Sequence, residues 1–339
     1  MKLSVQHGKV DLYHGSGGRA MVQLIDQIFL REFANPILAQ KNDQALLALP
    51  GKRIAYTTDS YVVSPLFFAG GDIGSLAVHG TINDLAVGGA EPLYLSVGFI
   101  LEEGFPLKDL RRIAQSMAKA AKKAGVSIVC ADTKVVERGK GDGVFINTSG
   151  IGMMAREQSL SRTPQPGDNI IINGYIGDHG TAIISQRENL SFATTIASDS
   201  APLHELTARM LRAAPSIRCM RDATRGGVAA VLNEWADYFK IGVLVREKTL
   251  PIRQQVQSAC ELLGLDPLYL ANEGKVIAIC PDDQTEALLK AMHSHPLGQK
   301  SVIIGQVTDD PLHLVQLETL MGGQRLVDWI AGEQLPRIC

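Results

Sequence analysis

The chain has 339 residues, of which 45% are hydrophobic and 20% are charged. This balance is typical of a folded globular protein and excludes a disordered, collagen-like or coiled-coil chain. The 33 basic and 35 acidic residues leave a formal charge of −2, so we expect no nucleic-acid partner. The chain has neither an apolar run of about 18 residues nor a secretory signal. We therefore expect no membrane association and a cytoplasmic location.

The length predicts two domains, because a typical domain has about 150 residues. We expect an N-terminal segment with a glycine-rich loop over 1–40, a first domain over 41–155, a second over 156–315 and a C-terminal tail over 316–339. The stretch around 156–168 is rich in Ser, Pro, Gln and charge, which is typical of an inter-domain connection. The tail is expected to be flexible because no later element holds it.

Helical and extended patterns alternate along both domains. Apolar side chains recur every three or four positions over 19–33, which predicts an amphipathic helix. In the first domain we expect strands near 54–58, 93–97, 127–130 and 144–147, and helices near 73–88 and 107–125. In the second we expect strands near 169–174, 242–246, 275–280 and 301–307, and helices near 202–213, 226–238 and 284–293. This order predicts the α/β (α+β) fold class.

A glycine-rich loop opens the first helix and consists of Gly15, Ser16, Gly17 and Gly18. Glycines allow backbone amides to approach an anion, and the helix dipole favours negative charge there. An ordinary flexible turn explains the spacing equally well. The chain has no P-loop, and the strand before Gly15 is too short and polar for a dinucleotide site. Any nucleotide would have to be held in another way.

Several aspartates stand in apolar or glycine-rich surroundings: Asp43, Asp59, Asp72, Asp84 and Asp222. Such carboxylates suit Mg²⁺, which takes one or two of them together with phosphate oxygens. Asp72 precedes a helix that has Ser75 in its first turn, a pattern that predicts a helix cap. Asp72 and Asp84 are roughly 18 Å apart along that helix and cannot share an ion. Asp84 is the candidate ligand, although any single Asp is often a cap or turn residue.

Two further charged residues stand at strand ends. Lys134 follows an extended run, where a lysine can bind phosphate or, if desolvated, transfer a proton. Glu273 stands at the entrance of an apolar strand, where partial burial would raise its pKa toward the working range of a base. Each is, taken alone, more often a surface charge or a turn residue. The sequence Gly177-Asp178-His179-Gly180 follows an apolar strand and predicts the start of a helix.

The five cysteines are scattered and form no C-x-x-C pair, which argues against a disulfide framework or structural zinc. Cys339 differs from the others because it is the last residue. It cannot belong to a prenylation box, which needs residues after the cysteine. It is either accidental or a thiol on a flexible arm that is loaded at one place and reacts at another.

Taken together, these motifs resemble the HypE family, the carbamoyl dehydratases of nickel-iron hydrogenase maturation. That family is part of the superfamily of aminoimidazole ribonucleotide synthetase and selenophosphate synthetase. The resemblance runs from about residue 10 to the last residue, and the terminal Pro-Arg-Ile-Cys is its most specific part. It is carried by residues 14–19, 57–65, 70–74, 80–86, 222–227, 272–275 and 336–339.

The resemblance implies a two-domain PurM-like fold, in which an N-terminal mixed-sheet domain dimerises and a C-terminal α/β domain follows. It implies ATP and Mg²⁺ as cofactors, with the loop Gly15–Gly18 covering the phosphates. The implied magnesium ligands are Asp43, Asp59, Asp84 and Asp222, and the implied nucleotide-binding residues are Asp59, Asn83, Asp84 and Asp222. The implied catalytic residues are Lys134 and Glu273 for proton transfer and Cys339 as the carrier.

The resemblance also implies a sequence of chemical steps. The carbamoyltransferase HypF would load a carbamoyl group on the Cys339 thiolate, and ATP would phosphorylate the amide oxygen so that phosphate becomes the leaving group. Loss of two nitrogen protons would leave thiocyanate, and the cyano group would pass to iron held by a HypC–HypD complex. The same resemblance implies a homodimer.

Two other functions are weighed against this one. Selenophosphate synthetase resembles the chain less well because residues 1–40 contain no cysteine. A non-catalytic scaffold with a metal-carrying terminal thiol belongs to a different class, and a single cysteine is a poor metal site by ligand count.

Overall fold

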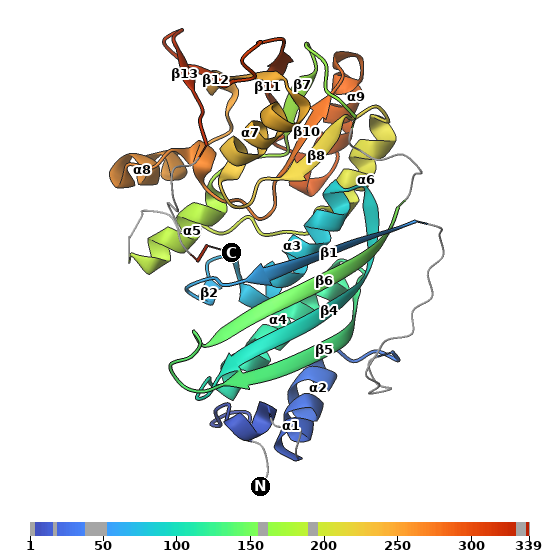
Figure 1. Cartoon of the computed structure of the whole chain (residues 1–339), viewed down its shortest axis with the longest axis vertical. Helices are drawn as coiled ribbons and strands as arrows, with labels where there is room; N and C mark the ends of the chain where they lie inside the picture. The colour runs from blue at the N-terminus through green and yellow to red at the C-terminus, as the bar shows by residue number, and fades with distance from the viewer. Residues whose placement is uncertain are drawn as a thin grey trace.

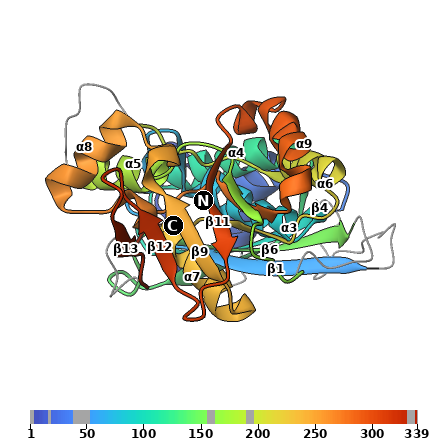
Figure 2. The same cartoon turned by 90° about the horizontal axis from the view of Figure 1, so that it is seen from above.

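The computed structural model describes residues 4–15, 19–37, 53–154, 162–188, 196–329 and 337–338. These residues form two domains, one around a four-stranded sheet and the other around a seven-stranded sheet (Figure 1). Figure 2 shows strands of the first sheet passing beneath the second domain. The mixed α/β architecture confirms the predicted fold class.

The first domain begins with a broken helix and continues as a sheet covered by two long helices. Its helical segments are η1 (Leu12–Gly15), α1 (Arg19–Leu24), the π-helical η2 (Ile25–Phe29), α2 (Leu30–Glu32), α3 (Ile73–Val87) and α4 (Leu107–Lys123). Its strands are β1 (Ile54–Tyr61), β2 (Phe67–Phe68), β3 (Gly71–Asp72), β4 (Ala90–Glu102), β5 (Ser127–Val136) and β6 (Val144–Met154). The expected helix at 19–33 and all four expected strands are confirmed.

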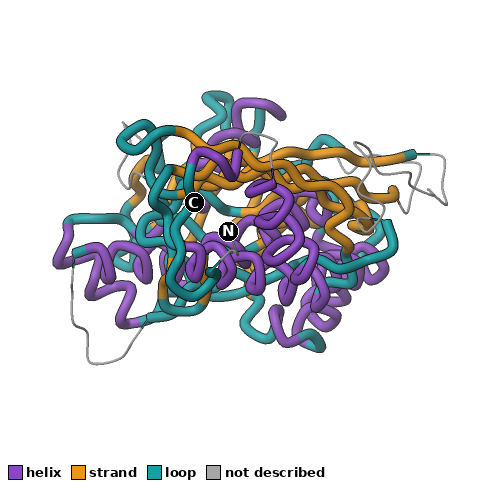
Figure 3. Tube along the Cα trace, turned by 90° about the horizontal axis from the view of Figure 1, so that it is seen from below, coloured by secondary structure: helices purple, strands orange, loops and turns teal. Residues whose placement is uncertain are grey.

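The first sheet has the strand order β1-β6-β4-β5. Strands β4 and β5 are parallel, and the other neighbours are antiparallel, so the sheet is mixed, as expected. Helices α3 and α4 pack on one face of this sheet, and the right half of Figure 3 shows the long strands on one side with helices on the other. Polar side chains are exposed on the opposite face, among them Thr58, Ser60, Asp132, Lys134 and Asn147.

Helix α3 begins at the cap that its sequence predicts. The Asp72 carboxylate accepts hydrogen bonds from the backbone N–H groups of Gly74 and Ser75, at 2.8 and 3.0 Å. The Ser75 hydroxyl in turn accepts from the Asp72 N–H at 3.1 Å, which completes a capping box. The helix is buried nearly all round because it lies between the first sheet and the second domain.

The second domain has a seven-stranded sheet with helices around it. Its strands are β7 (Asn169–Ile172), β8 (Cys219–Asp222), β9 (Gly242–Arg246), β10 (Val276–Cys280), β11 (Val302–Thr308), β12 (Val315–Glu318) and β13 (Gln324–Leu326). Its helical segments are α5 (Asp178–Arg187), α6 (His204–Ala213), α7 (Gly227–Phe239), η4 (Glu247–Thr249), α8 (Gln254–Leu263), η5 (Pro267–Tyr269), α9 (Asp282–His293) and η6 (Pro296–Gly298). The strand order is β13-β12-β9-β11-β7-β10-β8.

The expectation of a flexible tail from residue 316 is wrong for its first part. Strand β12 pairs in parallel with β9 and antiparallel with β13. Leu317 and Val327 are buried in the second core, so burial of apolar side chains holds this segment on the sheet. Near the chain end, Ile338 is also buried, in the core of the first domain.

The two domains share apolar contacts. The core of the first domain includes Ile183 and Ala271 of the second. The segment 198–203 crosses between them: the Ser198 N–H donates to the carbonyl of Ala69 at 2.8 Å, and the Ala201 N–H donates to that of Glu273 at 3.4 Å. This segment places residues 272–275 beside the end of α3.

Candidate functional site

Acidic side chains from distant parts of the chain meet between the domains. Asp59 is on β1, Asp84 is in the last turn of α3, Asp222 ends β8, and Glu273 precedes β10. The Thr57 hydroxyl donates to the Asp84 carboxylate at 2.8 Å. Asp84 therefore lies at the end of α3 that faces β1, as the sequence predicted.

The carboxyl groups of this acidic cluster (Asp59, Asp84, Asp222 and Glu273) repel one another. Burial raises the pKa of Asp222 to about 7, and the charge of Asp84 contributes to the same shift. Burial also raises the pKa of Asp84, partly offset by the Thr57 hydrogen bond and reinforced by the charge of Asp59. A bound cation would relieve this repulsion.

Glu273 is the most deeply buried member, with 2% of its surface exposed. Burial raises its pKa well above the ordinary value, and the charges of Asp222 and Asp199 add to the effect. Among the described residues, its Oε1 atom has no hydrogen-bond partner. Because an unpaired buried carboxyl is costly, this side chain is a candidate for proton transfer.

The described residues contain no group of three His, Cys, Asp or Glu side chains close enough to form a ready-made metal centre. Mg²⁺ does not need one, since it takes one or two carboxylates together with phosphate oxygens and water. The repelling carboxylates Asp84 and Asp222 fit that requirement. Asp43 lies outside the described residues.

The C-terminal end of the chain reaches this region. Arg337 and Ile338 line a pocket of about 530 Å³ together with Asp59 and Arg225. The backbone carbonyl of Arg337 accepts a hydrogen bond from the Ser64 N–H at 3.1 Å. Cys339 itself lies outside the described residues, as do Ser16, Gly17 and Gly18 of the glycine-rich loop.

Asn83, which the resemblance implies as a nucleotide-binding residue, is buried and engaged within the protein. Its amide donates to the carbonyls of Ala201 and Glu273, both at 3.1 Å, and its Oδ1 accepts from the Leu203 N–H at 2.8 Å. In this structure Asn83 ties the end of α3 to residues 198–203 and fixes the backbone of Glu273.

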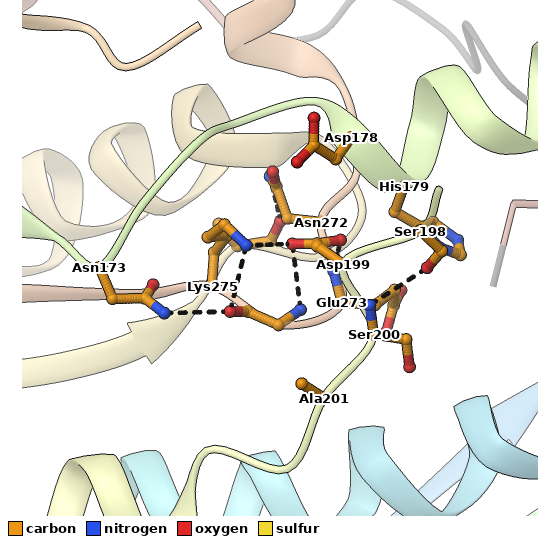
Figure 4. Close-up of polar contacts among 12 residues, drawn as sticks. Asn173, Asp178, His179, Ser198, Asp199, Ser200, Ala201, Asn272, Glu273 and Lys275 are labelled. Atoms are coloured by element: carbon orange, nitrogen blue, oxygen red, sulfur yellow. Dashed lines mark hydrogen bonds and ion pairs between the residues drawn. The ribbon is translucent and has the colours of Figure 1, made fainter. Parts of the chain in front are cut away.

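Sequence reasoning missed the buried ion pair beside Glu273. The Lys275 Nζ atom donates to the Asp199 carboxylate at 2.7 Å, and the Glu273 N–H donates to the same carboxylate at 3.0 Å (Figure 4). A Cβ on Gly274 would collide with the Asp199 carbonyl oxygen, so only glycine permits this approach. No sequence pattern pairs Asp199 with residue 275, because the contact depends on the fold.

Two predicted residues lie elsewhere. The Lys134 side chain is on the exposed face of β5 and makes no hydrogen bond or ion pair to any described residue, and Gly15 ends η1, which contacts β5. Because β1 and β5 are opposite edges of a four-stranded sheet, they are roughly 14 Å apart at 4.7–4.9 Å per strand. One chain therefore does not bring Lys134 and Gly15 to the acidic cluster.

The chain matches known proteins along its whole length. Residues 41–154 match the family described as AIR synthase related protein, N-terminal domain, and residues 165–317 match the corresponding C-terminal domain. Carbamoyl dehydratase HypE of Azotobacter vinelandii is 58% identical over 339 residues, which is 100% of this chain and 99% of the relative. The Escherichia coli carbamoyl dehydratase HypE is 47% identical, covering 97% of this chain and 99% of its own. The chain belongs to the HypE family of carbamoyl dehydratases.

Solved structures of HypE proteins agree with this membership. A HypE structure in complex with ATP has a TM-score of 0.92 at 49% identity, covering 97% of this chain and 99% of its own. A HypE–HypF complex contains a chain with a TM-score of 0.79 at 48% identity, covering 91% of this chain and 99% of its own. The resemblance to the HypE family is therefore confirmed, and the chain is an enzyme of that family. The roles of the individual site residues stay predictions.

Proposed function

We propose that this chain uses ATP to dehydrate an S-carbamoyl group on Cys339 to S-thiocyanate, the source of cyanide ligands for the iron of nickel-iron hydrogenase. The observation that carries the proposal is the position of Arg337 and Ile338 in the pocket that Asp59 lines. The residue that follows them in the chain is Cys339, which bears the thiol. The names of the relatives support the activity, whereas the selenophosphate synthetase and scaffold alternatives have no such support.

The reaction requires the carbamoyl oxygen to leave, and oxide is a poor leaving group in water. The carbonyl oxygen attacks the γ-phosphorus of ATP, and ADP departs. One nitrogen proton is lost as the C=N bond forms, and the second is lost as the C–O bond breaks and phosphate leaves. The oxygen ends in phosphate, so the products are thiocyanate, ADP and inorganic phosphate.

ATP binding in this chain is supported by the HypE structure that contains ATP. Mg²⁺ would be held by Asp84 and Asp222, with Asp59 and Asp43 as the other predicted ligands. When bound, it would neutralise charge on the transferred phosphoryl group. The loop Gly15–Gly18 is proposed to cover the phosphates.

Glu273 and Lys134 are the proposed proton acceptors. Glu273 is held rigidly, since its N–H donates to Asp199 and its carbonyl accepts from Asn83 and Ala201. A carboxyl with a raised pKa at this place takes a proton from the amide nitrogen more readily than an ordinary glutamate. Lys134 is on the far edge of the first sheet and would have to act from a second copy of the chain.

A homodimer fits these positions. The exposed polar face of the first sheet would pair with the same face of a partner chain, which would bring the partner's β5 edge toward the acidic cluster. HypF is the proposed carbamoyl donor, in line with the HypE–HypF complex, and a HypC–HypD complex is the proposed cyanide acceptor. Among the described residues no helix is long and apolar enough to cross a bilayer, and a cytoplasmic location stays a prediction.

Mass spectrometry of the C-terminal peptide tests the reaction. After incubation with HypF, its carbamoyl donor and ATP, we expect a carbamoylated form and then a form lighter by one water. Cys339→Ala should give neither form while it keeps the fold. Asp84→Asn should become carbamoylated but fail to lose water. A carbamoylated wild-type protein that never loses water would contradict the proposal.

Mixed dimers test the shared site. Lys134→Ala and Cys339→Ala are each expected to be inactive alone. If Lys134 serves the partner's thiol, a mixed dimer of the two regains one complete site and forms thiocyanate. If Lys134 acts within its own chain, the mixture stays inactive, and the shared site is wrong.

A further inference from the structure

The carbonyl groups of Arg337 and Ile338 are recognised by side chains of helix α5. His179 Nε2 lies 2.8 Å from the carbonyl oxygen of Ile338, and Arg187 Nη2 donates to that of Arg337 at 2.8 Å. Arg187 Nη2 also donates to the carbonyl of Ser64 at 2.7 Å, and the Ser64 N–H donates back to Arg337. We call these contacts the tail seat. They bind backbone carbonyl groups of the tail and do not depend on which side chains the tail carries.

The hydrogen-bond network determines which nitrogen of His179 carries the proton. The Ser198 hydroxyl oxygen accepts from the Ser200 N–H at 3.1 Å and lies 2.8 Å from His179 Nδ1. The Ser198 hydroxyl can therefore donate to Nδ1 in the tautomer that carries its proton on Nε2. Since a carbonyl oxygen can only accept, the Nε2–H donates to Ile338. Burial lowers the pKa of His179, which keeps the ring neutral.

The side chain of Ile338 completes the tail seat. Only 4% of its surface is exposed, and it belongs to the core of the first domain, which also includes Ile183 of α5. Phe68 packs edge-on against the His179 ring, with centroids 5.5 Å apart, and so fixes the ring plane. Burying an isoleucine is worth about 1.5–3 kcal/mol and each backbone hydrogen bond about 1 kcal/mol, against about 1–2 kcal/mol for ordering each residue. Loss of a single hydrogen bond therefore weakens the tail seat without abolishing it.

We propose that His179 and Arg187 are positioning residues for the carrier cysteine: they hold Arg337 and Ile338, the two residues before Cys339, at the pocket that Asp59 lines. This inference rests on the proposed function and deepens it. The same contacts are expected to have opposite effects on carbamoyl loading and on dehydration. A tail held in the tail seat is close to the acidic cluster but is less accessible to the partner that loads it. Weakening the tail seat therefore slows dehydration and leaves loading equal or faster.

Trimming by a carboxypeptidase tests the tail seat without any carbamoyl chemistry. The enzyme removes residues one at a time from the chain end, and Ile338 can be removed only when the tail leaves the tail seat. Mass spectrometry of the intact protein measures this loss. We expect His179→Leu and Arg187→Met to lose Ile338 about fivefold faster than wild type, the effect of one hydrogen bond. His179→Gln keeps an N–H donor and should restore slow trimming. Arg246→Met is the matched control, because the Arg246 side chain makes an exposed ion pair with Glu318, on a strand far from the tail seat.

Single-turnover assays on the same proteins test the positioning role. We expect His179→Leu to accept the carbamoyl group at least as fast as wild type and to form thiocyanate about fivefold more slowly. Ile338→Ala should behave alike, and Ile338→Val should stay near wild type. Unchanged trimming would overturn the tail seat, and faster trimming with unchanged dehydration would overturn the positioning role. If wild type forms no thiocyanate, the proposed function fails while the trimming result still decides whether the tail seat exists.

Discussion

Asp199 and Glu273 are neighbouring buried acids whose pKa values are shifted in opposite directions. Burial alone would raise the pKa of Asp199, but the charge and hydrogen bond of Lys275, together with the Glu273 N–H, hold it below the ordinary value. Glu273 has no such partner among the described residues, and burial with the surrounding carboxylates raises its pKa. We therefore expect Asp199 to contribute to stability, and the acidic cluster to lower stability while it contributes to binding or catalysis.

Replacing Glu273 should separate function from stability most clearly. We expect Glu273→Gln to lower the rate of thiocyanate formation by about 10²-fold or more, because the amide cannot take a proton. The fold should stay intact, since glutamine has nearly the same size and shape as glutamate and its uncharged amide costs less to bury than a carboxylate. Intact mass after carbamoyl loading measures the rate, and Glu286→Gln on α9 is the control. A rate equal to wild type would remove Glu273 from proton transfer.

Replacing Asp199 should have the reverse effect. We expect Asp199→Ala to lower the free energy of unfolding by about 3–5 kcal/mol, because Lys275 would be left charged and buried without a partner. Urea unfolding measures the change. Asp237→Ala, which breaks the exposed pair with Lys240, should cost no more than about 1 kcal/mol. Equal losses in the two variants would contradict the distinction between the buried and exposed pairs.

Asp222 gives the acidic cluster a predicted pH dependence. Its pKa rises from 3.8 to about 7 on folding, so the unfolded chain ionises first and Asp222 lowers stability progressively over that pH range. Asp222→Asn stays neutral and should therefore raise the melting temperature at pH 8 relative to wild type, but not at pH 3.5. Thermal unfolding at both pH values measures this. If the melting temperatures of Asp222→Asn and wild type differ by the same amount at pH 8 and at pH 3.5, folding does not raise the pKa of Asp222 and the prediction is wrong.

The weakest effect is predicted at the α3 cap, away from both acids. We expect Asp72→Ala to lower the free energy of unfolding by about 1 kcal/mol through loss of the capping box. Asp109→Ala, in the first turn of α4 where no side chain caps the helix, should cost about 0.5 kcal/mol. Chemical denaturation of both proteins compares them, and thiocyanate formation should be normal in each. A larger loss for Asp109→Ala would reverse the assignment.

Local sequence was sufficient for much of the fold. The Asp72–Ser75 spacing places a donor and an acceptor within one helical turn, so the start of α3 follows from the sequence. The same holds for the amphipathic helix at 19–33 and for Asp84 at the end of α3. Strand β12 was missed because it is short and lies between a polar stretch with Pro311 and a turn with Gly322 and Gly323, although Val315 and Leu317 alternate as in a half-buried strand.

Reading the sequence alone identifies the chemically able residues and the elements that carry them: acids at strand and helix ends, glycines at close approaches, and a terminal cysteine. Which of them meet depends on how the two domains pack. Asn83 contacts Glu273 across 190 positions, and His179 contacts Ile338 across 159. Lys134 and Asp59 are instead kept apart by the order of the strands. Backbone propensities act over a few residues, whereas these contacts form only when both domains have packed, and so local patterns cannot reveal them.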